Sequence, residues 1–538
     1  MSDGAVRTIE KSVRYDRGIR IWGNEGQSAL EEATVCLLNC SATGAEALKN
    51  LVLGGINAFT IVDDAHVSSI DLGNNFMVYP SSLGKPRAQV VTETLKELNE
   101  LVNGSFVEDT AGNIIENNPC FFKSYTLVIA TQISERDALA LDAICRESGI
   151  PLILARSYGL VGMLRTCLNE HCIVDTKPEN VVQDFRFGNP WVALRELAST
   201  VDFQTLDAAA HGHIPYGILL VKATEEWMRR YPNKALPSTF SERQEYKDII
   251  KSWQLKVDDC PIPEENFDEA LLNVTKVWSP KPLPSDIARI LEDEKVNTID
   301  TSSESFWIIC AALRRFVRET GHLPVHPSIP DMHSSTSSYL KLQQVYQEKF
   351  NTEVSRIHAY CQDILKHIGI DATTITVGMV QKVCLHCRSL RVIRPKRLYP
   401  LSEIETPKAL KQGIDCESER YSATIYITLR CIDAFYEQHA RFPGSGDSVD
   451  TEEDSILLKQ IIASCTGDLF TRISSEISDD MLCEIVRSGG EELHCIAAIL
   501  GAMASQEAVK LLTCQLVPVS GTLIYDGINC TSTVLDIN

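Results

Sequence analysis

The chain has 538 residues, of which 44% are hydrophobic and 23% are charged, so it is long enough for two or three globular domains. Its formal net charge is -21, which argues against a nucleic-acid-binding protein because such proteins need an excess of Lys and Arg on at least one face. The sequence shows no uninterrupted apolar run of the roughly 18 residues that a membrane-spanning helix needs. We therefore expect a soluble protein of the cytoplasm, the nucleus or both, with no membrane partner.

Short apolar runs alternate with amphipathic patterns over residues 1–170. The apolar runs are bounded by Gly, Pro, Asn or charged residues and are typical of buried strands, whereas helical spacing prevails between them. Strands that are apolar on both faces and separated by helices predict a doubly wound parallel sheet, and hence an α/β, Rossmann-like fold. The expected strands are 34–39, 58–63, 125–131 and 150–156, and the expected helices are 44–55, 85–102 and 135–149.

Long amphipathic patterns dominate residues 171–482 and predict a mainly helical region. In residues 483–538 the first pattern returns, with one apolar helix and two strand-like runs at 521–527 and 531–537. Because these runs need a sheet to join, we expect them to pack with the N-terminal α/β unit, so that the helical region is a large insertion. The apolar side of the C-terminal helix carries Leu493, Ile496, Leu500, Met503 and Ala504.

The turn after the first predicted strand reads NCSATG over residues 39–44, where a nucleotide-binding Rossmann unit has G-x-G-x-x-G. A phosphate at a helix N-terminus needs close approach of the backbone, and the side chains of Asn39 and Ser41 obstruct it. Only Gly44 stays suited to the task. Asp63 and Asp64 end the second strand, and they are either acceptors for ribose hydroxyls or ordinary polar terminators.

Eighteen cysteines are spread over the chain, and Cys36, Cys310 and Cys495 lie in apolar runs. This usage indicates reduced thiols in the core and not a disulfide framework. Cys384 and Cys387 form a C-x-x-C pair without a second pair at zinc-finger spacing. We therefore expect no metal site.

Several stretches resemble the regulatory subunits of the heterodimeric activating enzyme (E1) for the ubiquitin-like protein NEDD8, called RUB in plants. Some phrases are closest to the plant members of the auxin-resistance type. The likeness follows the family's order over nearly the whole chain. The stretches that carry it are YDRGIRIWGNEGQSALEEATVCLLNCSATGAEALKNLVLGGI (15–56), DLGNNFMV (71–78), LVIATQ (127–132), RSYGLVG (156–162), SFWIICAAL (305–313), IPDMHSSTSSYLKLQQVY (329–346) and GAMASQEAVKLLT (501–513).

The resemblance implies an adenylation fold of the ThiF/MoeB type, paired pseudo-symmetrically with a catalytic subunit that alone binds ATP and magnesium. We expect no cofactor in this chain. Catalytic halves carry an Arg where this sequence has Asn74, and a metal-binding Asp where it has Gln132. Lys85 matches a basic position of the family, but we favour the interpretation that this single lysine is a solvated charge.

Arg17, in the segment YDRG, is the predicted catalytic contribution of this chain. In related adenylating enzymes the matching Arg crosses the dimer interface and touches the nucleotide phosphates of the opposite half, where a cation stabilises the charge on transferring phosphates. The alternative is a structural Arg paired with Asp16 or Glu25. Gly18 stands where the family usually has Gln, which leaves the positioning of Arg17 open.

A loop that runs into an amphipathic helix is the predicted surface for the catalytic subunit, although packing within the chain is the alternative. The family's thioester chemistry needs a nucleophilic Cys, usually followed by Thr. Cys465 and Cys530 precede Thr, but neither occupies the matching place, and we expect both to be passive. The predicted partner-binding residues are Asp331, Met332, Tyr339, Leu342, Gln343 and Tyr346.

The chain is thus expected to be the non-catalytic subunit of an E1 that activates NEDD8/RUB and serves cullin ligases through a NEDD8-conjugating E2. The predicted domains are a pseudo-adenylation part at 1–170, a helical insertion at 171–482 that resembles a catalytic-cysteine domain without the cysteine, and a return at 483–538. The alternatives are a self-sufficient adenylating or dinucleotide-binding enzyme and a scaffold unrelated to activation.

Overall fold

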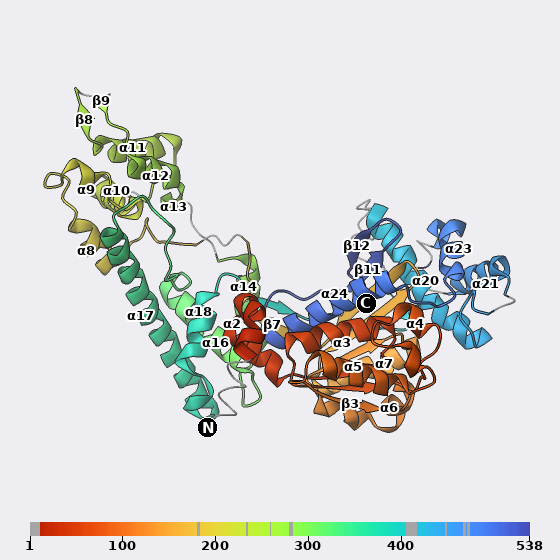
Figure 1. Cartoon of the computed structure of the whole chain (residues 1–538). Coiled ribbons are helices and arrows are strands. Elements are labelled where there is room, and N and C mark those ends of the chain that lie inside the picture. The colour runs from red at the N-terminus through yellow and green to blue at the C-terminus, as the bar shows by residue number, and fades with distance from the viewer. Residues whose placement is uncertain are drawn as a thin grey trace. The chain divides into compact units, whose positions relative to one another are not determined.

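The computed structural model in Figure 1 describes residues 11–179, 183–232, 235–258, 260–278, 283–404, 417–446, 449–465, 470 and 474–537. The chain divides into two compact units. Unit 1 is made of Met1–Ile173 together with Val392–Asn538, and unit 2 is Val174–Arg391. One unit is therefore discontinuous in sequence, as expected.

Unit 1 is built on a mixed sheet, in which the described residues form eight strands in the order β12-β11-β6-β5-β4-β1-β2-β3. The five strands from β5 to β3 are parallel, and β6, β11 and β12 extend the sheet with antiparallel pairs. The predicted parallel sheet is confirmed, and β11 and β12 are the predicted C-terminal strands that join it. β3 and β6 were not predicted. The strands of this sheet are β1 (Thr34–Leu38), β2 (Ala58–Val62), β3 (Asn103–Val107), β4 (Leu127–Thr131), β5 (Leu152–Tyr158), β6 (Val161–Cys167), β11 (Thr522–Asp526) and β12 (Thr531–Leu535), and the short strand β7 (His171–Ile173) lies outside it.

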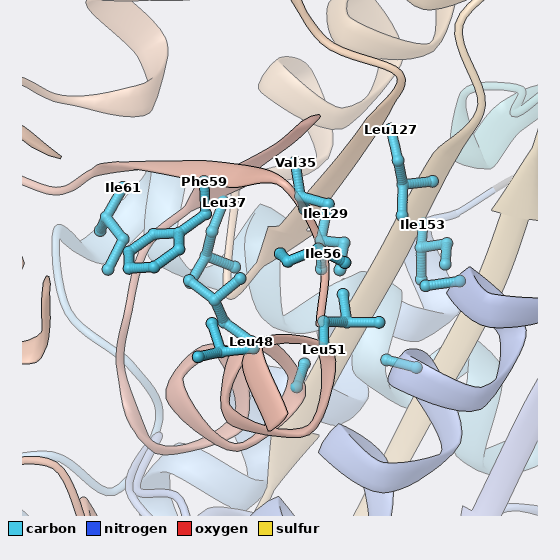
Figure 2. Packing of buried hydrophobic residues seen from close by; sticks show 14 of the residues in the cluster. Val35, Leu37, Leu48, Leu51, Ile56, Phe59, Ile61, Leu127, Ile129 and Ile153 are labelled. Atoms are coloured by element: carbon cyan, nitrogen blue, oxygen red, sulfur yellow. The ribbon is translucent and has the colours of Figure 1, made fainter. Parts of the chain in front are cut away.

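Side chains of alternate strand residues point to opposite faces of this sheet, and each face is covered by helices. Val35 and Leu37 of β1 pack with residues of α3, α5 and α24, whereas Cys36 and Leu38 pack with α6 and α7. Figure 2 shows the first face, where Leu48 of α3 points towards the strand side chains. The helices are α2 (Asp16–Glu32), α3 (Ala42–Gly54), α4 (Asp71–Asn74), α5 (Arg87–Leu98), α6 (Ala111–Asn117), α7 (Glu135–Ser148), α20 (Glu417–His439), α21 (Thr451–Ser464), α23 (Asp479–Arg487) and α24 (His494–Thr513).

The second boundary between the units lies at residue 392, whereas the sequence suggested 483. Residues 392–482 were assigned to the insertion because their patterns are helical. In the structure, α20 packs on the antiparallel strands β11 and β12. Arg156 of β5 also forms two hydrogen bonds to the Asp433 carboxylate of α20, at 2.5 and 3.0 Å. Helical pattern alone could not show that this segment belongs to the sheet.

The C-terminal helix α24 has the length and apolarity of a membrane span, and half of its most apolar window is buried inside the protein. It packs against α3, α2, β5 and β6, which are the contacts of a core helix; the α3 and α24 ribbons run side by side in Figure 1. Ile496, Leu500 and Ala504 are buried as predicted. Leu493 and Cys495 are exposed, so Cys495 is not the core thiol that its apolar run predicted.

Unit 2 is mainly helical, as predicted, and its core forms around α10, with contributions from α8, α11, α12 and α17. α17 begins at a Ser335 side chain that accepts a hydrogen bond from Ser338 N–H, and it ends at Gly369 in the left-handed conformation. The remaining elements are α8 (Val192–Ser199), α9 (Ala208–His211), α10 (Tyr216–Arg230), α11 (Phe240–Ser252), β8 (Lys256–Val257), β9 (Cys260–Pro261), α12 (Glu265–Asn273), α13 (Thr275–Trp278), α14 (Ser285–Leu291), α15 (Glu294–Asn297), α16 (Ser305–Thr320), α17 (Thr336–Ile368), α18 (Val377–Leu385) and β10 (Arg391–Ile393).

The contact of α3 with α24 depends on Gly501. A Cβ atom at this position would lie 2.6 Å from Glu46 Cβ and 2.8 Å from the Ala47 backbone nitrogen. Gly501→Val should lower the free energy of unfolding by about 2 kcal/mol, measured by urea denaturation, because the two helices would have to separate. The neighbouring Ala502 is exposed, so Ala502→Val should change stability little. Equal effects of the two substitutions would contradict the proposed packing.

Candidate functional site

The N-terminus of α3 lies at the carboxyl ends of β1 and β4, where Rossmann-like folds bind phosphate. In this chain a carboxylate from 450 residues downstream occupies that place. Glu492 accepts hydrogen bonds from the backbone N–H groups of Ala42 and Thr43, both at 3.1 Å. It also accepts bonds from the hydroxyls of Thr43 at 2.5 Å and Ser157 at 2.8 Å. The helix N-terminus therefore already holds an anion.

The turn before α3 is fixed by contacts within the chain. Asn39 adopts the left-handed conformation with φ 63°, and its side-chain amide donates a hydrogen bond to Thr131 O at 2.9 Å. Gly44 has no room for a side chain, because a Cβ would lie 2.3 Å from Asn39 O and 2.8 Å from Thr131 Oγ1. Glycine is thus required at position 44 for the packing of the turn. Its presence is no sign of a nucleotide.

The Asp63 carboxylate is also buried and hydrogen-bonded to groups of the same chain. It is 1% exposed, and it accepts hydrogen bonds from Cys40 N–H at 2.8 Å and Ala65 N–H at 2.9 Å. The Cys40 thiol and Arg87 Nε donate further bonds at 3.2 and 2.9 Å. The carboxylates at the end of β2 were predicted either to accept ribose hydroxyls or to be ordinary polar residues that end the strand. This geometry favours the second role for Asp63, whereas Asp64 is exposed.

Arg87 is one of two cations at this edge of the sheet among the described residues that line a pocket there, and Arg156 of β5 is the other. Arg87 pairs with Asp63 and, at 2.9 Å, with Asp71. Burial lowers the pKa of the Arg87 guanidinium, but the two carboxylates outweigh this effect and raise it above its ordinary value. Burial raises the pKa of Asp71, yet hydrogen bonds from Ser68 and the charge of Arg87 bring it below its usual range. Lys85, the basic residue noted in the sequence, is exposed.

A pocket of about 300 Å³ lies beside the Glu492 carboxylate in unit 1. Asn74 and Gln132 line it, and their amide groups donate to Glu492 O and Ser157 O at 3.0 and 2.7 Å. Their amide oxygens have no partner among the described residues. Burial raises the pKa of Glu491, which also lines the pocket, and Glu492 and Asp71 raise it further. Arg87 and Arg156 also line the pocket, but both guanidinium groups are paired with carboxylates of the chain. Little unpaired positive charge is therefore left there for a polyphosphate.

Arg17 lies in the first turn of α2 and is exposed. Among the described residues its guanidinium has no hydrogen-bond or ion-pair partner. Asp16, which was considered as its partner, pairs with Arg20 at 3.0 Å. The structural pairing of Arg17 with Asp16 is thus not observed, and the cation is available to a group outside this chain.

The predicted partner-binding segment divides into buried and accessible residues. Leu342 and Tyr346 are 0% exposed, and the Tyr346 hydroxyl donates to Phe185 O at 2.6 Å. This corrects the predicted surface, because both side chains belong to the core of unit 2. Asp331 is exposed, and Met332, Tyr339 and Gln343 are partly exposed.

The two cysteines that precede Thr differ in their surroundings. Cys530 is exposed in the turn between β11 and β12, whereas Cys465 is partly exposed and follows α21. Neither side chain lies at the α3 site or in unit 2.

The ThiF family matches residues 15–537 of the chain. This protein belongs to the ThiF family. Within it, the chain is 40% identical to the NEDD8-activating enzyme E1 regulatory subunit AXR1 of Arabidopsis thaliana over 98% of its own length and 97% of that protein. It is 36% identical to the NEDD8-activating enzyme E1 regulatory subunit of Gallus gallus over 99% of each chain. The tRNA N6-threonylcarbamoyladenosine dehydratase TcdA of E. coli aligns with 28% of this chain and 66% of its own, at 24% identity and a TM-score of 0.26.

Two residues of this ThiF-family site were missed by sequence reasoning. Glu492 directly precedes an apolar helix and reads as a polar helix start, so no local signal connects it with α3. Arg87 is separated from Lys85 only by Pro86, and the pattern does not tell which of the two basic residues faces the carboxylates.

Removal of the Glu492 carboxylate should destabilise unit 1. Glu492→Ala leaves two backbone N–H groups at a buried helix end without an acceptor, which costs about 2–3 kcal/mol of unfolding free energy. The measurement is urea denaturation, and Glu491→Ala is the matched control because Glu491 accepts none of these bonds. Inorganic phosphate should raise the melting temperature of Glu492→Ala more than that of the wild type, since an anion would refill the helix N-terminus. Equal stability of the two variants would contradict this role of Glu492.

Proposed function

We propose that this chain is the regulatory subunit of a heterodimeric E1 that activates NEDD8, and that it binds no nucleotide itself. The observation that carries the proposal is the Glu492 carboxylate, which occupies the position where a phosphate would bind at the N-terminus of α3. Similarity to E1 regulatory subunits over 98% of the chain supports the assignment to this enzyme. A protein whose own anion site is filled needs a second subunit for adenylation.

In the proposed complex, ATP and magnesium bind to the catalytic subunit, which forms the NEDD8 adenylate and the thioester. NEDD8 then passes to a conjugating E2 that serves cullin ligases, in the cytoplasm, the nucleus or both. Arg17 of this chain reaches across the subunit interface to the nucleotide phosphates. Its exposure and its lack of a partner among the described residues support this role, since a cation stabilises negative charge that develops on transferring phosphates.

Unit 2 supplies a second contact surface in the proposal. Leu342 and Tyr346 anchor α17 in the core of unit 2. The accessible side chains of the same segment bind the catalytic subunit in this proposal. Those side chains are Asp331, Met332, Tyr339 and Gln343.

The decisive assay is NEDD8-dependent exchange of pyrophosphate into ATP. We expect no exchange by this chain alone and exchange by the chain with its catalytic subunit. Arg17→Ala should lower the exchange rate of the pair at least about tenfold, because the phosphates lose a cation. The matched control is Arg20→Ala, which removes an exposed Arg from the same helix.

Exchange by the chain alone would establish the self-sufficient enzyme instead. Equal exchange rates for Arg17→Ala and Arg20→Ala would contradict the contact of Arg17 with the nucleotide phosphates. They would favour the alternative that the chain is a scaffold.

Substitutions of an accessible and of a buried residue in the predicted partner-binding segment should have different effects. Asp331→Arg should weaken co-purification with the catalytic subunit and leave the melting temperature of this chain unchanged. Leu342→Ala should lower the free energy of unfolding by about 2–5 kcal/mol, because it creates a cavity in the core of unit 2. Calorimetry of this chain and pull-down of the pair measure the two effects. Normal co-purification of Asp331→Arg would exclude Asp331 from the interface.

A further inference from the structure

Two thiols meet where α20 and α21 pack together in unit 1. Cys431 lies in the middle of α20 and is 0% exposed, whereas Cys465 directly follows α21 and is partly exposed. Their Sγ atoms are 3.9 Å apart, which is van der Waals contact between two sulfur atoms. A disulfide requires an approach by about 2 Å, a movement within reach of side-chain rotation. The apolar cluster of α20, α21 and α23 surrounds the pair.

The two sulfurs differ in acidity. With Cys431 as the donor, the hydrogen bond to Cys465 Sγ lowers the pKa of Cys465 to about 7, although burial and the Glu135 carboxylate raise it. The same contact and burial raise the pKa of Cys431. Arg430, the neighbour of Cys431, pairs with Glu135 at 2.8 Å and offsets the charge of that carboxylate. Cys465 is thus the more acidic of the two thiols, and the thiolate is the reactive form of cysteine.

We propose that Cys465 is a site of oxidative modification by peroxide and that Cys431 converts the product into a disulfide. The Cys465 thiolate attacks hydrogen peroxide, so that an S–O bond forms and the O–O bond breaks, and the departing hydroxide takes up a proton as water. Cys431 Sγ then attacks the sulfenic sulfur of Cys465. The S–S bond forms, the S–O bond breaks, and the hydroxyl leaves with the Cys431 proton as a second water. The two thiols together lose two electrons, which the peroxide gains.

The contact between Cys431 and Cys465 was not predicted from the sequence, which indicated a passive Cys465. A disulfide would tie the end of α21 to α20, the helix whose Asp433 holds Arg156 of the sheet. The inference does not rest on the proposed role in NEDD8 activation, because it concerns residues away from the α3 site.

The test uses the purified full-length chain, reduced and then exposed to hydrogen peroxide. Peptide mass spectrometry without reductant should find Cys431 cross-linked to Cys465. Before oxidation, iodoacetamide at pH 7 should alkylate Cys465 faster than Cys120, although Cys120 is the more exposed thiol. Cys431→Ala should slow the alkylation of Cys465 about fivefold or more, because the thiolate loses its hydrogen-bond donor.

Two further variants complete the design. In Cys431→Ala, dimedone should trap a sulfenic acid on Cys465 after peroxide treatment, and no cross-link should form. Cys465→Ser should abolish the cross-link, whereas the matched control Cys120→Ser should retain it. A wild-type chain that forms no cross-link, or a Cys465 that reacts no faster than Cys120, would overturn the proposal.

Discussion

A single carboxylate at the N-terminus of one helix determines what unit 1 is able to do. A helix end presents unpaired N–H groups and a positive dipole, and a buried end must find an acceptor. Glu492 supplies that acceptor from within the chain, with four hydrogen bonds from α3 and β5. An adenylating enzyme leaves the same groups to its nucleotide. In this chain a carboxylate of the protein itself lies at the helix end where a Rossmann-like unit binds phosphate.

The surrounding residues follow the same electrostatic logic. Arg87 is bound to two carboxylates, and Asp63 accepts hydrogen bonds from Cys40, Ala65 and Arg87, so neither group is left to a ligand. The remaining pocket offers acceptor oxygens and acidic groups, and its two arginines, Arg87 and Arg156, are already paired with carboxylates of the chain. Arg17, by contrast, is exposed and has no partner among the described residues. The internal site is closed by pairing within the chain, and the free cation faces outward.

Most of the parallel strands of the sheet were predicted correctly from the sequence, but only some of the residues of the site were. β1, β2, β4 and β5 are mainly apolar and mainly buried, and this pattern made them recognisable. β3 was missed because NGSFV is polar and lies at the sheet edge, where little of it is buried. The changed turn at residues 39–44 led to the prediction that no nucleotide binds there, which stays a prediction, and the sequence supplied only part of the physical reason for it. Obstruction by Asn39 and Ser41 was predicted, whereas the decisive group is Glu492, whose contact with α3 joins residues too far apart for any local pattern.

The large sequence separation between contacting residues of unit 1 also affects how this unit folds during synthesis. Arg165 and Thr522, which are hydrogen-bonded across the sheet, are separated by 357 positions, and Glu492 and Thr43 by 449. During synthesis the ribosome releases the parallel strands first, and the whole of unit 2 follows before β11 emerges. The nascent chain therefore carries an incomplete sheet with an exposed edge at β6 and an uncapped α3 while unit 2 is translated. A truncation before residue 492 would leave it in that condition permanently.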